Sequence, residues 1–266
     1  MKYAFSTLGL PGTPLARSAA LAAGHGYQGL ELRAHPEEPL HPHSPPGDRA
    51  AGLRTLNRAG VRVLGVAGYA KVAAPGGDEP VLGELRSLVR LAADLEAPFV
   101  RVFPGGVGLP GTQADGNAVR RLREAAPYAE RNGVRILLET HDSHRTAAAA
   151  ARVLDAVGHP GAGALWDVLH TWLGGEGPAE SRRRLGPHLG YVQVKDVASA
   201  DDLTPVALGA GVLPLAGAVA AAPADGWLCW EYERRWYPEA PELTGPRLIR
   251  GREHLEELVA HAGQAE

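Results

Sequence analysis

Short segments rich in Val, Leu and Ile alternate along the whole chain with longer segments in which apolar residues recur at helical spacing. The apolar segments are eight predicted strands, at residues 3–8, 29–33, 61–67, 99–103, 134–139, 163–167, 191–195 and 227–233. Predicted helices follow them at residues 14–26, 47–60, 79–97, 115–133, 144–158, 179–186, 214–222 and 247–263. This alternation favours a parallel sheet, because parallel neighbours need a crossover connection.

The number of strand–helix units indicates the architecture. Eight units in 266 residues suit a (β/α)8 TIM barrel, which needs roughly 250 residues. The chain is 45% hydrophobic, which is enough to bury a large core, and no change in composition marks a domain boundary. We therefore expect one α/β domain, a TIM barrel over residues 1–266.

A glycine-rich segment supplies the main alternative fold. The segment "GVGLPG", residues 106–111, has the Gly-x-Gly-x-x-Gly spacing of a dinucleotide-binding turn in a doubly wound sheet. Pro110 interrupts it, the helical pattern resumes only near Asp115, and the segment follows the fourth strand instead of the first. We interpret it as a loop at the mouth of a barrel. The longer segment "PGGVGLPG", residues 104–111, is either a plain loop or a cradle for a phosphate group.

Polar residues stand at the C-terminal ends of the last four predicted strands. Helices cover the outside of such a barrel, so polar residues in the strands should point inward. The four that do so are Glu139, Asp167, Gln193 and Glu231. Active sites of TIM barrels lie at this end, and converging carboxylates repel one another unless a cation neutralises them. An all-oxygen ligand set predicts one divalent metal ion, Mn²⁺ or Mg²⁺ in preference to Zn²⁺.

Each of these residues also has a simpler interpretation. A single Glu at a strand end commonly forms a salt bridge or a cap, and Gln193 alone could fill a polar core layer. Lys195 and Asp196 could form a local ion pair. The Pro-rich segment 33–49 contains three His residues and reads as a loop after the second strand, able to close over a substrate. Three carboxylates at successive strand ends nevertheless favour a site.

Six motifs in this order resemble the xylose isomerase-like TIM-barrel superfamily, in its sugar phosphate isomerase/epimerase branch. They cover nearly the whole chain: "GYQGLELR" (26–33), "LLETHD" (137–142), "LWDVLH" (165–170), "YVQVKD" (191–196), "LGAGVLPL" (208–215) and "CWEYERRWYPE" (229–239). The resemblance implies that Glu139, Asp167, Gln193 and Glu231 hold the metal. Gln193 departs from the family, in which this position is His, and Ala210 stands where the family usually has Glu.

The resemblance also implies a reaction. In this family a metal binds the carbonyl and hydroxyl oxygens of a ketose while two carboxylates remove and return a proton on the neighbouring carbon. Glu139 and Glu231 would be these two groups in a sugar or sugar phosphate isomerase or epimerase. The residues expected to contact the carbohydrate substrate are His141, His170, Lys195, Arg101, Glu31 and Arg33. Trp230, Tyr232, Trp236 and Tyr237 are candidates for the pocket wall.

Three other functions share this barrel. An inosose-type dehydratase would start with the same proton abstraction, and a non-catalytic sugar-binding barrel would suit the altered position 193. An endonuclease IV-type enzyme would share the pair Asp167 and His170. That enzyme needs more His ligands than the strand ends offer and a basic surface, whereas the formal charge here is −3. We expect no nucleic-acid partner.

The remaining features concern the cellular setting. The single cysteine, Cys229, can form no internal disulfide, and the start of the sequence lacks the apolar run of a signal peptide. No segment approaches the length of a membrane span. We expect a cytoplasmic protein without a membrane partner, and the sequence leaves open whether it forms a homo-oligomer.

Overall fold

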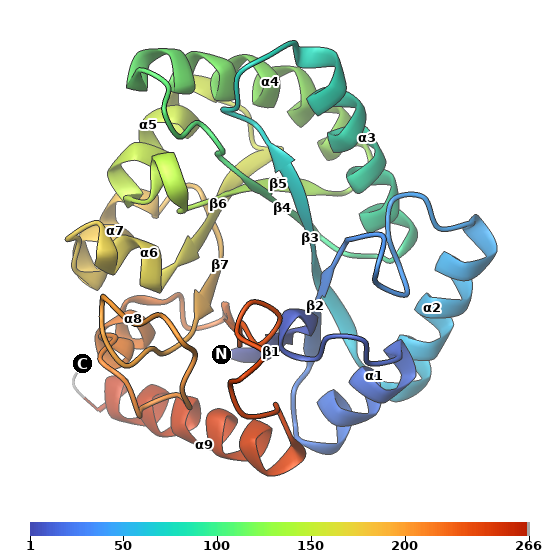
Figure 1. Ribbon diagram of the computed structural model, residues 1–266, viewed down its shortest axis with the longest axis vertical. Coiled ribbons are helices and arrows are strands. Elements are labelled where there is room, and N and C mark those ends of the chain that lie inside the picture. Colours follow the sequence, from blue (N-terminus) through green and yellow to red (C-terminus); the bar gives the residue numbers. More distant parts are fainter. Residues whose placement is uncertain (265–266) are drawn as a thin grey trace.

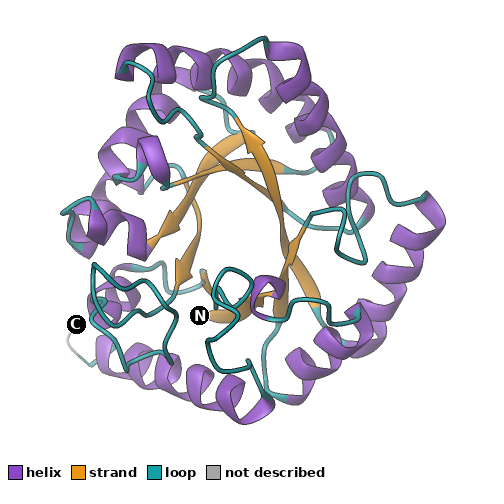
Figure 2. Ribbon diagram, viewed as in Figure 1, coloured by secondary structure: helices purple, strands orange, loops and turns teal. Residues whose placement is uncertain are grey.

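Eight parallel strands close into a barrel in the computed structural model, which describes residues 1–264. Each strand pairs with the next, and the first pairs with the last. The strands are β1 (Lys2–Ser6), β2 (Gly29–Arg33), β3 (Arg62–Lys71), β4 (Phe99–Phe103), β5 (Arg135–Glu139), β6 (Ala162–Asp167), β7 (Leu189–Val194) and β8 (Trp227–Trp230). The ring of strands lies inside a ring of helices (Figures 1 and 2), so the predicted (β/α)8 fold is confirmed.

The helices occupy the predicted segments with some changes at their ends. They are α1 (Leu15–Gly24), α2 (Pro46–Ala59), α3 (Asp78–Asp94), α4 (Gly111–Arg131), α5 (Ala147–Val157), α6 (Val168–Leu173), α7 (Pro178–Leu185), α8 (Leu215–Ala221) and α9 (Gly245–Ala262). Short 3₁₀ turns lie at Thr7–Gly9 and Asp142–His144. Helix α4 begins at Gly111 instead of near Asp115, so the glycine-rich segment does lead directly into a helix. Helix α6, directly after β6, was not predicted.

Successive side chains along each strand point alternately into the barrel and outward to the helices. A small buried cluster fills the interior and consists of Ala4, Leu64, Leu137, Leu165, Tyr191 and Cys229. Because side chains two apart in a strand share a face, the residues that follow Leu137, Leu165, Tyr191 and Cys229 by two also point inward. Leu137 thus leads to Glu139, and Tyr191 leads to Gln193. A lower apolar layer therefore supports a polar layer at the C-terminal ends of the strands.

The opposite faces of the strands join the main core beneath the helices. Trp230 is fully buried there, against α9, where a Cβ at Gly251 would lie 2.2 Å from the indole ring. Tyr232 packs edge-on against Trp230 and is also buried. The prediction that these two aromatic rings could wall the pocket is wrong, because their positions in the chain direct them outward to α9. No helix within residues 1–264 has the length and apolar character needed to cross a membrane.

Candidate active site

A cavity of about 240 Å³ opens at the C-terminal ends of the strands. Five of the sequence-predicted site residues line it: Arg101, Glu139, His141, His170 and Glu231. The rest of its wall consists of Leu8, Tyr69, Phe103, Leu169, Leu203, Glu233 and Trp236. Strands on opposite sides of the barrel thus contribute charged groups to one small space.

Glu139 is the last residue of β5 and is 2% exposed. Its Oε2 lies 3.1 Å from Nε of Arg101, which comes from the middle of the neighbouring strand β4. Burial raises the pKa of Glu139 to about 8, despite the opposing charge of Arg101. Oε2 has no hydrogen-bond partner within the described residues. This carboxyl group is therefore held in place by the charge of Arg101, through a contact that lacks the geometry of a hydrogen bond.

Asp167 ends β6 and caps helix α6. Its Oδ1 accepts the backbone N–H groups of Leu169, at 2.8 Å, and His170, at 3.4 Å. This cap starts a helix immediately after the strand, so His170 lies on α6. Oδ2 points the other way and forms an ion pair with Lys195. One oxygen of Asp167 thus caps helix α6, and the other faces the charged residues of the site.

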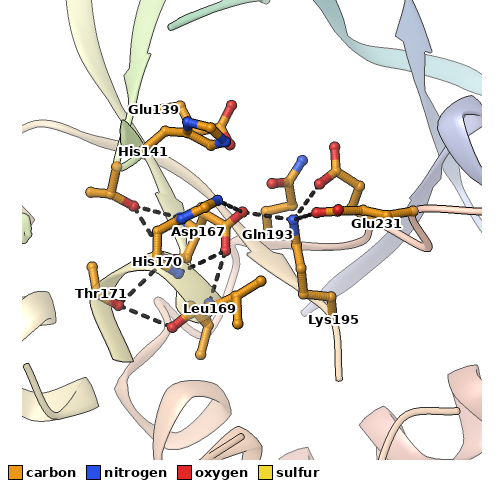
Figure 3. Close-up of polar contacts among 12 residues, drawn as sticks. Glu139, His141, Asp167, Leu169, His170, Thr171, Gln193, Lys195 and Glu231 are labelled. Atoms are coloured by element: carbon orange, nitrogen blue, oxygen red, sulfur yellow. Dashed lines mark hydrogen bonds and ion pairs between the residues drawn. The ribbon is translucent and has the colours of Figure 1, made fainter. Parts of the chain in front are cut away.

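Lys195, just past the end of β7, supplies an internal cation. Its Nζ lies 2.8 Å from Asp167 Oδ2 and 2.5 Å from Glu233 Oε1, and it also pairs with Glu231 (Figure 3). These carboxylates raise the pKa of Lys195 well above its ordinary value, although burial opposes the change. The expectation that only a divalent ion would neutralise the carboxylates was therefore incomplete.

Asp196 does not pair with the neighbouring Lys195, so the predicted local ion pair is wrong. The Asp196 carboxylate is 1% exposed and accepts four backbone N–H groups, those of Val197, Gly209, Gly211 and Leu213, at 2.9 to 3.2 Å. These bonds hold the loop of residues 197–213, which brings Leu203 to the cavity. Asp196 thus shapes the cavity from a distance.

Gln193 lies on β7 beside Asp167 of β6 and is fully buried. Its Nε2 lies 3.4 Å from both carboxylate oxygens of Glu31 on β2. Glu31 also accepts a hydrogen bond from the Tyr191 hydroxyl. The amide oxygen of Gln193 has no partner in the described part of the chain. Glu31 therefore lies in the barrel interior, beneath the cavity, and contacts a residue of the site.

His141 and His170 stand together at one side of the cavity. Their ring centroids are 4.0 Å apart, and Phe103 packs against His141. Burial lowers the pKa of His170 to about 3, so its ring is neutral at physiological pH. These two rings and Glu139 offer ligand atoms within 4.8 Å of one another. A metal ion could thus receive nitrogen as well as oxygen ligands here.

The residues present fit a divalent metal ion. Gln193 Oε1 is a buried oxygen with neither a hydrogen bond nor an ion pair among residues 1–264, whereas Glu139 Oε2 pairs with Arg101 and Asp167 Oδ2 pairs with Lys195. All three oxygens belong to the predicted ligand set. Carboxylate and amide oxygens are hard donors. In addition, five carboxyl groups, those of Glu31, Glu139, Asp167, Glu231 and Glu233, lie near two cations, Arg101 and Lys195. Burial raises the pKa values of Glu31, Glu139 and Glu233, and a bound cation would favour their ionised forms. An additional positive charge is electrostatically favourable in this cluster.

Arg33 lies outside the cavity lining, unlike the other predicted arginine. Its guanidinium group donates to the Tyr69 hydroxyl and to Glu38, both at 2.7 Å. It also stacks on Tyr69 and Trp236, two aromatic residues of the cavity wall. Arg33 therefore holds the wall in place, and direct contact with a substrate is not what this geometry favours.

The glycine-rich loop before α4 is occupied by internal contacts. The N–H of Gly105 donates to Asp142, and the N–H of Gly106 donates to Ser143 at 3.0 Å. The phosphate cradle suggested for this loop thus loses two of its donors, and the plain-loop interpretation fits better.

Sequence reasoning missed several residues of the site. Glu233 was not among the predicted site residues, although it lines the cavity and contacts Lys195. Tyr69 and Phe103 lie at the ends of β3 and β4, where a search limited to charged residues overlooks them. A search for aromatic residues at strand ends would have found both.

Comparisons with known proteins agree with this geometry. A 3-dehydroshikimate dehydratase from Bacillus anthracis is 24% identical over 183 residues, which cover 67% of this chain and 65% of that protein. The fold is similar to that of a D-psicose 3-epimerase from Clostridium cellulolyticum H10, with a TM-score of 0.81 and 15% identity over 98% of this chain and 99% of the other. The fold is also similar to that of the IOLI protein, solved with a zinc atom. The TM-score is again 0.81, with 20% identity over 98% of this chain and 99% of that protein. Residues 19–258 match the family model for the xylose isomerase-like TIM barrel, and the chain belongs to this family.

Proposed function

We propose that the protein is a divalent-metal-dependent isomerase or epimerase that transfers a proton at a carbon beside a carbonyl group of a small polyhydroxylated substrate. One observation carries the proposal: Glu139 of β5 and Glu231 after β8 line the same small cavity. Two carboxylates in one cavity allow one to take the proton and the other to return it. The cavity volume of about 240 Å³ suits a small molecule.

The chain would hold the metal through Glu139, Asp167, Gln193 and Glu231. A bound Mn²⁺ or Mg²⁺ would polarise the substrate oxygens and stabilise negative charge on them. Arg101 orients Glu139 through its ion pair, and Lys195 orients Glu231. His141 and His170 face the same cavity and can donate or accept hydrogen bonds with substrate hydroxyls.

A dehydratase is the second candidate, and the sequence relationship to a 3-dehydroshikimate dehydratase favours it. The first step would be the same removal of a proton from carbon by a carboxylate. The electron pair of that C–H bond would then form a carbon–carbon double bond as the neighbouring C–O bond breaks. The departing hydroxyl would take a proton from the other carboxylate or from His141 and leave as water.

The test is solvent deuterium uptake by the Mn²⁺-loaded protein with a panel of ketoses, ketose phosphates, inososes and 3-dehydroshikimate. An epimerase incorporates deuterium and inverts the carbon, whereas a dehydratase yields the unsaturated product. Glu139→Gln and Glu231→Gln should each lower the rate by at least about 100-fold, within the usual contribution of general acid–base catalysis. Glu253→Gln, at an exposed position on α9, is the matched control and should keep full activity.

Two results would count against the proposal. Absence of deuterium exchange with the whole panel, in protein shown to contain metal, would favour the non-catalytic sugar-binding barrel. Full activity of both Gln variants would show that Glu139 and Glu231 do not carry the proton.

A further inference from the structure

The amide group of Gln193 uses only one of its two ends. Its nitrogen faces both oxygens of Glu31 at 3.4 Å, while its oxygen has no partner within residues 1–264. The residue is fully buried, so water does not easily satisfy that oxygen. An unpaired amide oxygen in such a position is costly unless something binds it.

Glu31 reaches Gln193 across the barrel. It lies on β2, and β1 and β8 separate β2 from β7 in the closed sheet. The Tyr191 hydroxyl donates to Oε2 of Glu31 and so fixes the carboxylate from the apolar layer below. Tyr191 and Gln193 stand two residues apart on the same inward face, so one carboxylate contacts both.

The orientation of the Gln193 amide decides whether the residue can bind a cation. The two ends of a Gln amide have nearly the same shape, but only the oxygen can bind a cation, because the nitrogen is a donor. Carboxylate oxygens accept hydrogen bonds and therefore attract the nitrogen end. The amide oxygen then points toward the side of the cluster that holds Asp167, as Figure 3 shows.

We propose that Glu31 is a positioning residue that orients the Gln193 amide so that its oxygen, and not its nitrogen, faces the metal. The inference rests on the metal site of the proposed function and deepens it. Its consequence is that Gln193 adds an oxygen ligand to those of Glu139, Asp167 and Glu231, which shifts the preference of the site toward hard cations such as Mn²⁺ and Mg²⁺ and away from Zn²⁺.

The experiment measures Mn²⁺ and Zn²⁺ affinities of the folded protein by titration calorimetry, without reference to activity. Glu31→Gln supplies an amide that both donates and accepts, so it no longer selects the orientation of Gln193. We expect Mn²⁺ affinity to fall by about 10- to 100-fold, as for other residues that orient a ligand. Glu38→Gln is the matched control, a buried carboxylate nearby that pairs with Arg33, and should leave Mn²⁺ affinity unchanged.

A second background separates orientation from charge. In Gln193→His, an imidazole nitrogen can bind the metal, and no amide needs to be oriented. Adding Glu31→Gln to this variant should therefore weaken Mn²⁺ binding by less than about threefold. That change is well below the usual effect of losing an orienting residue. Gln193→His alone should shift the preference toward Zn²⁺. Thermal melts monitor folding, and Tyr191→Phe, which removes one hydroxyl from Glu31, replaces Glu31→Gln should that variant not fold. It should weaken Mn²⁺ binding in the same direction.

Three results would overturn the inference. They are unchanged Mn²⁺ affinity in Glu31→Gln, an equal loss in both backgrounds, and absence of Mn²⁺ binding by the unmodified protein. The first two results would leave the proton exchange catalysed by the unmodified protein unaffected. They would therefore contradict the role of Glu31 without contradicting the proposed function.

Discussion

Lys195 Nζ lies 2.8 Å from Asp167 Oδ2, in the place where the sequence predicts that a divalent metal ion neutralises the carboxylates. The site therefore contains its own cation, and within the described residues Gln193 Oε1 is left as a buried site oxygen with neither a hydrogen bond nor an ion pair. In the proposed function, the ammonium group and a bound metal ion would together balance the negative charge of the cluster. Their contributions can be separated by experiment.

Lys195→Met should destabilise the metal-free protein and strengthen its metal binding. Removing the ammonium leaves Asp167, Glu231 and Glu233 without their partner, and loss of one member of a buried ion pair costs about 3–5 kcal/mol. The free energy of unfolding in urea measures the first effect, and Mn²⁺ titration measures the second. Lys71→Met, at an exposed position, should change neither. Weaker Mn²⁺ binding in Lys195→Met would contradict the expected repulsion between the two cations.

Metal removal should lower the melting temperature. A metal that binds only the folded state stabilises it by about 2.7 kcal/mol at a free concentration 100 times Kd. Addition of excess chelator should therefore abolish the increase in melting temperature that Mn²⁺ produces. Asp167→Asn keeps a capping oxygen for α6 but removes a charged ligand, so Mn²⁺ should stabilise this variant less. Equal stabilisation of both proteins would place the metal elsewhere.

His144 should make stability depend on pH. It is 1% exposed and bonds Asp115 at 3.0 Å, and burial lowers its pKa below the ordinary value of 6.5. The folded state then favours the neutral ring, so this stabilisation is complete above pH 6.5 and is lost as the pH falls below it. The free energy of unfolding should fall less steeply between pH 7 and about 5 in His144→Gln than in the unmodified protein. His43→Gln, at an exposed position, should retain the original slope.

Asp196→Ala should loosen the loop of residues 197–213. The carboxylate accepts four backbone N–H groups, and each buried donor left unpaired costs about 1–3 kcal/mol. Hydrogen exchange by mass spectrometry should show faster exchange at Gly209 and Gly211. Asp196→Asn retains one acceptor oxygen and should have a smaller effect. Unchanged exchange in Asp196→Ala would mean that other contacts hold the loop.

The sequence alone was sufficient to predict the strands and to predict that the site residues point into the barrel. The period of two in β5 and β7 relates Glu139 to Leu137 and Gln193 to Tyr191, and these relations hold in any barrel that follows the pattern. The C-terminal position of Glu139, Asp167, Gln193 and Glu231 follows from the parallel arrangement alone. Helix α6 was missed because the Asp167 cap that starts it is a local hydrogen bond and leaves no apolar period in so short a helix.

Which residues contact each other was decided only by closure of the barrel. In the sequence, Asp196 is the carboxylate nearest to Lys195. Only the folded barrel brings Asp167 and Glu231 close enough to pair with Lys195 instead. Glu31 and Gln193 are 162 residues apart in the chain and meet across the interior. Periodicity determines the face on which a side chain lies, because it depends on neighbouring residues. Distances across the barrel depend on all eight strands at once, so they belong to the tertiary structure.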